Sequence, residues 1–191
     1  MVAAIADAAG VPLSGELAQC VYLSLVSDTG SFTHGNTSAA VFALAARLVA
    51  GGLDAAAMRE KLDNQWTMPK TRLWGKLMQT LTLECEGRIA LCPVTSEEIT
   101  SFGAVREDLE GFVEQMRRIK GVRVAVLIRQ DPGRRCKLSL RSSGKDDVRS
   151  VAAVFGGGGH LNAAGATIDE ADLSAVIRQT ITAIQEVTLA E

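Results

Sequence analysis

The sequence has few of the residues from which metal centres are usually built. It contains only two histidines, and its four cysteines show no Cys-x-x-Cys spacing and have no histidine placed to complete a site. This excludes a zinc site of the Cys/His type. We therefore expect the four cysteines to be reduced thiols in the core.

The chain also lacks an excess of charge of one sign. Lys and Arg total 20 against 22 Asp and Glu, so the overall field does not steer the protein toward nucleic acid or membrane. An anionic ligand would have to be recognised locally. There is no secretory signal pattern and no apolar run of about 18 residues, so we expect a cytoplasmic protein without a membrane partner.

What the sequence does have is enough apolar material for a core. Its 191 residues are 47% hydrophobic, which fits one globular domain or two small ones. Residues 1–27 show helical spacing interrupted by AGVPLSG, which predicts two helices joined by a Pro/Gly turn. Helices are also predicted over 38–50, from about Asp54, and from Pro69 as a long helix that could connect two halves.

After Gly87 the pattern changes to that of a mixed α/β domain. The stretches RIALCPV, VRVAVLIRQ and RCKLSLRS have the length and β-branched content of strands. Helical patterns lie between them at about 95–119 and at 146–155. The tail forms an amphipathic helix whose apolar stripe is Leu173, Val176, Ile177, Ile181 and Ile184.

The stretch FGGGGHLNAAGATI places Gly156, Gly157, Gly158 and Gly159 before His160. Successive N–H groups without a Cβ can converge on an anion, and no side chain blocks its approach. The alternative is a flexible helix end followed by a turn. Four glycines and a histidine followed by small residues favour a ligand site for a phosphate or a nucleobase.

Alternation in KLSLRSSG places Lys137, Ser139 and Arg141 on one face of a strand. A guanidinium beside hydroxyls at a strand end can hold a phosphate. An edge strand with a solvated face would give the same pattern.

In SDTGSFTHGNT, Asp28 leaves an apolar helix and enters a glycine-containing loop, with His34 and Asn36 close behind. The carboxylate could be a metal ligand or could form a turn, and composition alone favours the turn. A two-metal site needs several Asp and His residues.

The helix from Pro69 carries Lys70, Arg72 and Lys76 around Trp74. Such residues usually form a solvated face, but on a helix between two domains they could contact substrate.

In their order along the chain, SDTGSF…NT, RLWGKLMQTL, DLEGFVEQMRRIKGVRVAVLIRQ, KLSLRS and FGGGGHLNAAG resemble the DHH superfamily of phosphoesterases, in its nano-RNase and pAp-phosphatase branch. The resemblance covers nearly the whole chain. It implies an α/β protein with a parallel-sheet catalytic domain that binds two Mn²⁺ ions and a smaller mixed-sheet DHH-associated domain. Residues 1–68 would be the helical C-terminal remnant of the catalytic domain. Residues 69–85 would form a connector helix, and residues 86–191 would be the DHH-associated, substrate-binding domain.

The same resemblance implies the roles of individual residues. Asp28 would be a catalytic metal ligand. Phosphate and base would be recognised by a set of residues from several motifs: Arg141, Ser139, Gly156, Gly157, Gly158, Gly159, His160, Asn162, Asn36 and, in the linker, Arg72.

The sequence departs from the family pattern in its first half. It has no Asp-His-His triplet and no Asp-x-Asp motif, and only 27 residues precede Asp28. Thr33 and His34 stand where relatives often carry a basic and an aromatic residue. We expect a C-terminal piece of a longer protein, with Met1 inside a longer helix.

The expected parent activity is hydrolysis of phosphoesters in short single-stranded RNA oligonucleotides and in 3′-phosphoadenosine 5′-phosphate (pAp), with this chain mainly holding the substrate and turning it over slowly or not at all. The alternatives are a nucleotide-binding regulatory module without catalysis and a cyclic-dinucleotide phosphodiesterase. Uncovered apolar faces on the helices of residues 1–60 would favour a homodimer.

Overall fold

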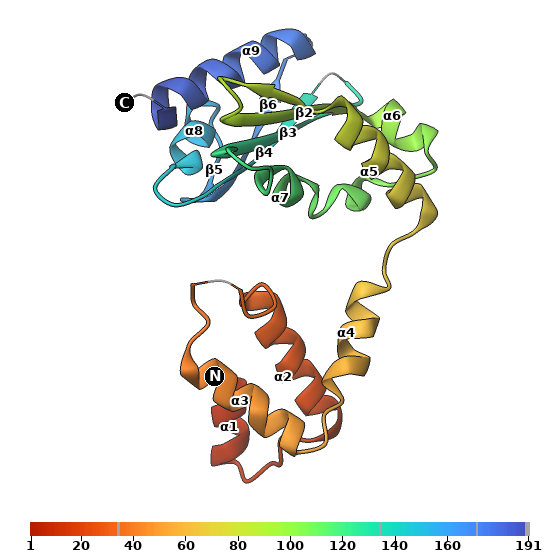
Figure 1. Ribbon diagram of the computed structural model, residues 1–191, viewed down its shortest axis with the longest axis vertical. Coiled ribbons are helices and arrows are strands. Elements are labelled where there is room, and N and C mark those ends of the chain that lie inside the picture. Colours follow the sequence, from red (N-terminus) through yellow and green to blue (C-terminus); the bar gives the residue numbers. More distant parts are fainter. Residues whose placement is uncertain (34, 134, 171, 190–191) are drawn as a thin grey trace. The chain divides into compact units, whose positions relative to one another are not determined.

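The computed structural model describes residues 1–33, 35–133, 135–170 and 172–189 and divides the chain into two compact units. Unit 1 is Met1–Trp66 and unit 2 is Thr67–Glu191. Unit 1 is helical where it is described, and unit 2 combines helices with a six-stranded sheet (Figure 1). The predicted α/β class is confirmed. The division into residues 1–68, 69–85 and 86–191 stays a prediction.

The described residues of unit 1 form four helices: α1 (Val2–Ala8), α2 (Gly15–Asp28), α3 (Ala39–Ala50) and α4 (Ala55–Asp63). Asp54 begins α4 as predicted, because its Oδ1 accepts the N–H of Ala57 at 2.9 Å. A small core of alanine, valine and leucine side chains lies between the helices: Ala3, Ala6, Leu13, Ala18, Val21, Leu48 and Leu53.

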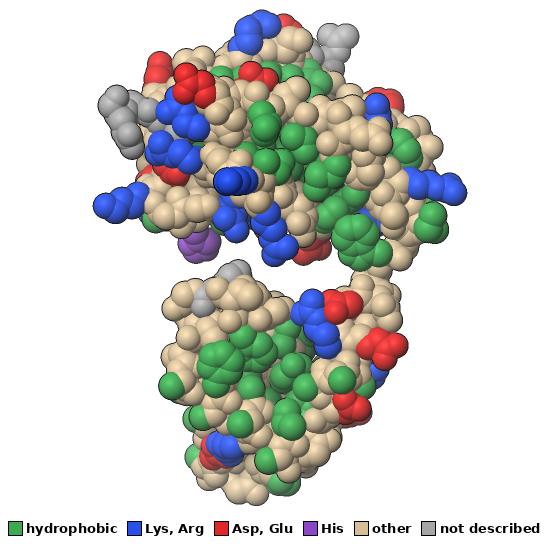
Figure 2. All heavy atoms as spheres, viewed as in Figure 1, with side chains coloured by type: hydrophobic (Ala, Val, Ile, Leu, Met, Phe, Trp, Pro, Cys, Tyr) green, Lys and Arg blue, Asp and Glu red, His purple; other side chains and the backbone are tan. Residues whose placement is uncertain are grey.

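Many large apolar side chains of unit 1 remain exposed. They are Met1, Val2, Ile5, Val11, Leu23, Phe42, Val49 and Trp66, and Figure 2 shows hydrophobic side chains over much of the visible face of this unit. Within the described parts of the chain, no single helix is long and apolar enough to span a membrane. The pair α3 and α4, bent by 107°, meets that criterion in length and composition only.

Unit 2 is organised by a mixed sheet. Its strand order is β1 (Thr82–Glu84), β2 (Ile89–Thr95), β3 (Val124–Asp131), β4 (Arg135–Ser142), β6 (Ala163–Asp169) and β5 (Gly158–His160). Strands β2 and β3 are parallel, and the other neighbouring pairs are antiparallel.

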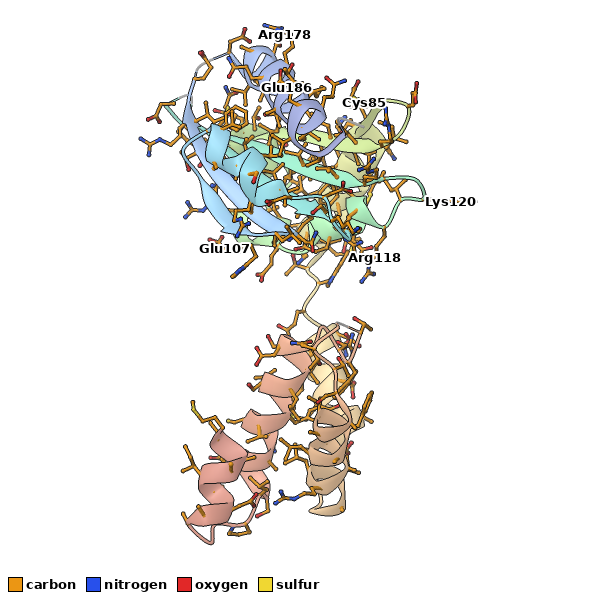
Figure 3. All side chains as sticks on the ribbon, turned by 90° about the vertical axis from the view of Figure 1, so that its left-hand side faces the viewer. Cys85, Glu107, Arg118, Lys120, Arg178 and Glu186 are labelled. Atoms are coloured by element: carbon orange, nitrogen blue, oxygen red, sulfur yellow. The ribbon has the colours of Figure 1, made fainter. Side chains whose placement is uncertain are left out.

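Each face of the sheet has its own core. On one face, α8 (Val148–Val154) and α9 (Leu173–Ile184), which continues into the π-helical turn η2 (Gln185–Leu189), cover apolar side chains of β2, β3, β4 and β6. On the other face lie α5 (Met68–Thr80), α6 (Ser96–Ser101), the 3₁₀ turn η1 (Arg106–Leu109) and α7 (Phe112–Arg117). Figure 3 shows Arg178 and Glu186 on one side of the sheet and Glu107 and Arg118 on the other. The predicted apolar stripe of α9 is confirmed.

Three predictions of local structure need correction. The helix from Pro69 ends at Thr80, and residues 82–84 form β1 instead. The helix predicted at 95–119 is broken at Gly103 and Gly111, whose φ angles of 67° and 85° do not fit a helix. Only Cys92 and Cys136 are buried thiols, whereas Cys85 is half-buried and Cys20 is exposed.

Candidate functional site

Four residues predicted from separate motifs lie on one face of the sheet in unit 2. The strand register places Ser139 opposite Gly165, and Gly165 opposite Gly158. In the neighbouring row, Arg141 is opposite Ala163, and Ala163 is opposite His160. Directly opposed residues share a face of the sheet. Two adjacent rows therefore bring Ser139, Gly158, Arg141 and His160 together.

Beside the basic side chains, part of this face has no side chains, and we call this part the glycine strip. Gly158 and Gly165 form the strip, with Arg141 and His160 in the row on one side. In the row on the other side, Arg129 is opposite Lys137. The alternate residues of β4, Leu138 and Leu140, are fully buried in the core of the opposite face. Figure 2 shows Lys and Arg side chains gathered on one side of unit 2, next to a His.

A pocket of about 260 Å³ lies between β3, β4 and the η1–α7 segment. We call it the basic pocket. Some of its charged and hydroxyl side chains were predicted from the sequence and others were not: Arg106, Arg129, Lys137, Ser139, Arg141, Glu110 and Glu114. Ser139 and Arg141 line the basic pocket, and in the sheet Ser139 lies in the row of the strip and Arg141 in the next row. The basic pocket therefore adjoins the glycine strip, because Ser139 of the pocket is directly opposite Gly165.

Two of the arginines in the basic pocket are held by carboxylates. Arg141 Nε donates to Glu114 Oε1 at 2.7 Å, and Arg129 makes two hydrogen bonds of 2.7 and 2.8 Å to Asp131. The Arg129 hydrogen bond lowers the pKa of the Asp131 carboxyl. Within the described residues the ammonium group of Lys137 has no hydrogen bond or ion pair, and Glu114 Oε2 is buried without a hydrogen-bond partner. An anion entering the pocket would compete with Glu114 for Arg141.

The glycine run is explained mainly by backbone packing. Gly156 has a φ of 72° and donates to Ala153 O at 3.0 Å, while the N–H of Gly157 donates to Ala152 O at 2.9 Å. These two N–H groups end α8, so they are not available for the anion nest that the sequence suggested. A Cβ on Gly157 would overlap the Gly165 carbonyl oxygen.

The other two glycines lie in β5. A Cβ on Gly159 would lie 2.5 Å from Ala163 O, whereas a Cβ on Gly158 would meet open space. A Cβ on Gly156 would also meet open space, but its φ of 72° favours glycine. Gly158 is thus the one glycine of the four that neither packing nor a left-handed φ requires, and it is the one on the strip.

Asn162 and Arg72 are placed differently. Asn162 Nδ2 donates to Ser142 Oγ at 2.9 Å and to the carbonyl oxygens of Gly144 and Asp146, so its amide ties the β5–β6 turn to the loop before α8. Arg72 is exposed on α5 and does not line the basic pocket. Their part in binding substrate stays a prediction.

In unit 1, Asp28 ends α2 immediately before a strained turn. Gly30, Ser31 and Phe32 all have left-handed φ angles of 54°, 59° and 65°. Such a conformation costs non-glycine residues about 1–3 kcal/mol each and is concentrated at functional sites. The turn is held by the buried Thr29, whose hydroxyl donates to Leu25 O at 2.6 Å.

The Asp28 loop brings two of the predicted residues together. Asn36 Nδ2 donates to the Asp28 carbonyl oxygen at 3.0 Å, and Arg59 of α4 donates to Ser31 Oγ at 2.7 Å. Asn36 therefore acts on the backbone, while the Asp28 residue stays exposed.

The described residues do not form a centre for two metal ions. Nowhere among them do three or more His, Cys, Asp or Glu side chains gather in a way that could hold a metal, and His34 lies outside the described residues. Asp28 offers a single carboxylate, which cannot by itself bind a catalytic metal.

Arg106, Arg129, Glu114 and Gly165 were missed by the sequence analysis. For Arg129 a signal was available, because a hairpin around Asp131-Pro132-Gly133 places it opposite Lys137. Glu114 gave no such signal, because its contact with Arg141 depends on where the helical segment 95–119 is broken.

Comparison with known proteins identifies the second half of the chain. Residues 92–186 match the DHHA1 domain model. The chain is 33% identical over 188 residues to the bifunctional oligoribonuclease and PAP phosphatase NrnA of Thermus thermophilus, an alignment covering 97% of this chain and 55% of that protein. It is 25% identical to the Bacillus subtilis protein of the same name, covering 85% of this chain and 52% of the relative.

A solved structure shows the same fold. An exopolyphosphatase-related protein from Bacteroides fragilis superposes with a TM-score of 0.83 at 30% identity, covering 90% of this chain and 50% of that one. The chain spans about half the length of the relatives it matches. Residues 92–186 therefore form a DHHA1 domain, and the matches over most of the chain confirm the predicted resemblance to DHH phosphoesterases.

Proposed function

We propose that the chain is the substrate-holding part of a metal-dependent phosphoesterase that acts on short single-stranded RNA oligonucleotides and on pAp. The oligoribonuclease and PAP phosphatase named among its relatives support this substrate class. In this proposal, unit 2 binds the phosphate and the nucleoside of the substrate.

The observation that carries the proposal is the meeting of four predicted residues on one face of the sheet. Arg141 offers a planar fork that suits phosphate oxygens, and Lys137 adds a charge that no described carboxylate neutralises. Ser139 adds a hydroxyl between them. Over Gly158 and Gly165 a sugar or base could lie directly against the backbone, with His160 at its edge.

Similarity to DHH phosphoesterases favours a divalent metal, and Mn²⁺ is the ion we propose. When bound, such ions would activate water and stabilise charge on the phosphoryl oxygens. Because the described residues do not form a centre for two metal ions, the role of this chain in the proposal is to position the substrate. Asp28 would contribute one ligand, held in place by the strained turn and by Asn36.

Calorimetric titration of pAp into the 191-residue protein tests the binding site. Arg141→Ala and Lys137→Ala should each weaken binding about tenfold, since each removes a contact to a charged group. Arg178→Ala is the matched control, because Arg178 lies on the other side of the sheet (Figure 3). Equal affinities for all four proteins would contradict the assignment.

Turnover gives a second test. Phosphate release from pAp by this chain should be very slow with Mn²⁺ present. Rapid release that depends on Mn²⁺ would show that the chain holds a complete metal centre.

One relative favours an alternative substrate. The chain is 27% identical, over 84% of its length, to the cyclic-di-AMP phosphodiesterase PdeA of Listeria monocytogenes, although it covers only 23% of that protein. A regulatory module that binds nucleotides without catalysis is the other alternative. Competition between cyclic di-AMP and pAp for the same pocket separates the substrates, because the preferred ligand displaces the other at lower concentration.

A cytoplasmic location and a homodimer belong to the same proposal. The exposed apolar side chains of unit 1 are the surface through which two copies would associate. Light scattering on the purified chain tests the dimer, and a monomer at all concentrations would contradict it.

A further inference from the structure

A second pocket adjoins the basic pocket in unit 2. Its volume is about 460 Å³, which lies within the range of about 300–1,000 Å³ typical of small-molecule sites. It is found where the parallel strands β2 and β3 end, at Thr95 and Asp131. In open α/β sheets, ligands bind preferentially outside the carboxyl ends of parallel strands. We call it the strand-end pocket.

The lining of the strand-end pocket has an apolar part and a polar part. The apolar part is Ile99, Ala104, Val105 and Pro132, and the polar part is Ser96, Thr100, Arg106, Glu107, Arg129 and Asp131. Apolar side chains and guanidinium planes can lie against the faces of a planar heterocycle, and carboxylates can accept hydrogen bonds from its amino groups. This combination suits a nucleobase better than a free phosphate.

Two arginines connect the strand-end pocket to the basic pocket. Arg106 and Arg129 line both. Arg129 is fixed in place, because Asp131 accepts two hydrogen bonds from it and is in turn contacted by Ser96 Oγ at 3.4 Å. A phosphodiester between these two guanidinium groups would therefore have the basic pocket on one side and the strand-end pocket on the other.

We propose that the strand-end pocket is a second nucleotide subsite, which takes the base of the neighbouring nucleotide in a short oligonucleotide. This inference rests on the proposed function, because it assumes that the first nucleotide occupies the basic pocket and the glycine strip. It gives the chain a preference for substrates of at least two nucleotides over a mononucleotide.

The test compares pAp with the dinucleotide pApA in the absence of divalent metal. The dinucleotide should bind about tenfold more tightly, which is the effect expected of one stacked base. Thr100→Phe should abolish this advantage, because Thr100 is exposed at the pocket and a phenyl ring there would fill it. Affinity for pAp should stay unchanged in this variant, which also reports that the protein is folded.

Ser101→Phe is the matched control. Ser101 is the next residue of α6 and is also exposed, but it does not line the pocket. It should keep the full preference for pApA. If Thr100→Phe does not fold, Val105→Asp places a charge at a pocket residue that is 57% exposed, and it should reduce the preference in the same way.

The outcomes separate this inference from the proposed function. A dinucleotide advantage that survives both Thr100→Phe and Val105→Asp overturns the second subsite. The second subsite is also overturned if pAp binding depends on Arg141 but pApA binds no more tightly than pAp. In that case the proposed function still stands. A wild-type protein that binds neither ligand overturns both.

Discussion

The two units of the chain bury their apolar side chains to very different degrees. Unit 2 has a core on each face of its sheet, with fully buried residues such as Leu140 and Phe112. Unit 1 has one small core in which Leu48 is the one large side chain that is fully buried, and Phe42 and Val49 of the same helix α3 are at least half exposed. Unit 2 therefore has the packing of a self-sufficient fold, whereas much apolar surface of unit 1 stays in contact with solvent.

The same contrast applies to the candidate residues. In unit 2, Ser139 and Arg141 project from a strand whose alternate side chains are locked in the core. In unit 1, Asp28 depends on a turn with three successive left-handed residues. Residues on packed strands hold their geometry more precisely than residues on loops. The comparison predicts that the candidate binding residues of unit 2 are organised within that unit, while the Asp28 carboxylate of unit 1 needs support from further residues.

The largest expected difference concerns the reactivity of thiols in the two units. Burial raises the pKa of Cys92 in unit 2 to about 12, so only about one molecule in 10,000 carries its thiolate at pH 8. Cys20 in unit 1 is exposed. Alkylation with iodoacetamide, followed by mass spectrometry, should modify Cys20 at least about 100-fold faster than Cys92. Similar rates in the native protein would show that the core of unit 2 opens readily.

The next effect is on the free energy of unfolding. Leu140→Ala removes a fully buried side chain from unit 2 and should lower that free energy by about 3 kcal/mol. Val49→Ala is the counterpart in unit 1. Because Val49 is half exposed, the change should stay within about 0.5 kcal/mol. Urea unfolding followed by circular dichroism measures both, and equal losses would contradict the contrast between the units.

The contrast between local pattern and tertiary packing also explains which features of the site could be predicted from the sequence. The face shared by Ser139 and Arg141 follows from the two-residue period of one strand, and it was predicted. Their meeting with Gly158 and His160 depends on the order β4-β6-β5, which a local pattern does not specify. The purpose of the glycines was only partly predictable, because the close approach of Gly157 to Gly165 exists only once β5 and α8 are packed. Unit 1 was predicted as helices, but the left-handed turn at Ser31 and Phe32 has no sequence signal.

A smaller effect separates two neighbouring glycines. Gly157→Ala should lower the free energy of unfolding by about 1–3 kcal/mol, because the new Cβ would overlap the carbonyl oxygen of Gly165. Gly158→Ala meets open space and should change it by less than about 0.5 kcal/mol. The added methyl group would lie on the strip, however, so pAp affinity should fall severalfold. A Gly158→Ala variant with normal stability and normal affinity would remove the strip from the site.

The smallest effect compares one ion pair in each unit. Arg129 in unit 2 and Arg47 in unit 1 each make two hydrogen bonds to an aspartate, Asp131 and Asp7, and in both cases this bonding lowers the pKa of the carboxyl. The side chains of the Asp131 pair are 14% and 26% exposed, whereas those of the Asp7 pair are 55% and 47% exposed. Salt should therefore screen the Asp7 pair more strongly.

When the pKa of a carboxyl is lower in the folded state, its ionised form stabilises the protein at pH values above the unfolded pKa of about 3.9. This contribution is lost as the pH falls through the lower pKa of the folded state. Asp131→Asn should thus cost about 1 kcal/mol near pH 7, and the difference from wild type should shrink below about pH 4. Asp7→Asn should show no resolvable effect in 0.5 M salt. Urea unfolding from pH 3 to pH 7 measures both variants. If Asp131→Asn lowers the free energy of unfolding equally across that range, the asparagine disturbs packing rather than the ion pair. If Asp7→Asn lowers it by the same amount as Asp131→Asn and independently of salt, the contrast between the two units is wrong.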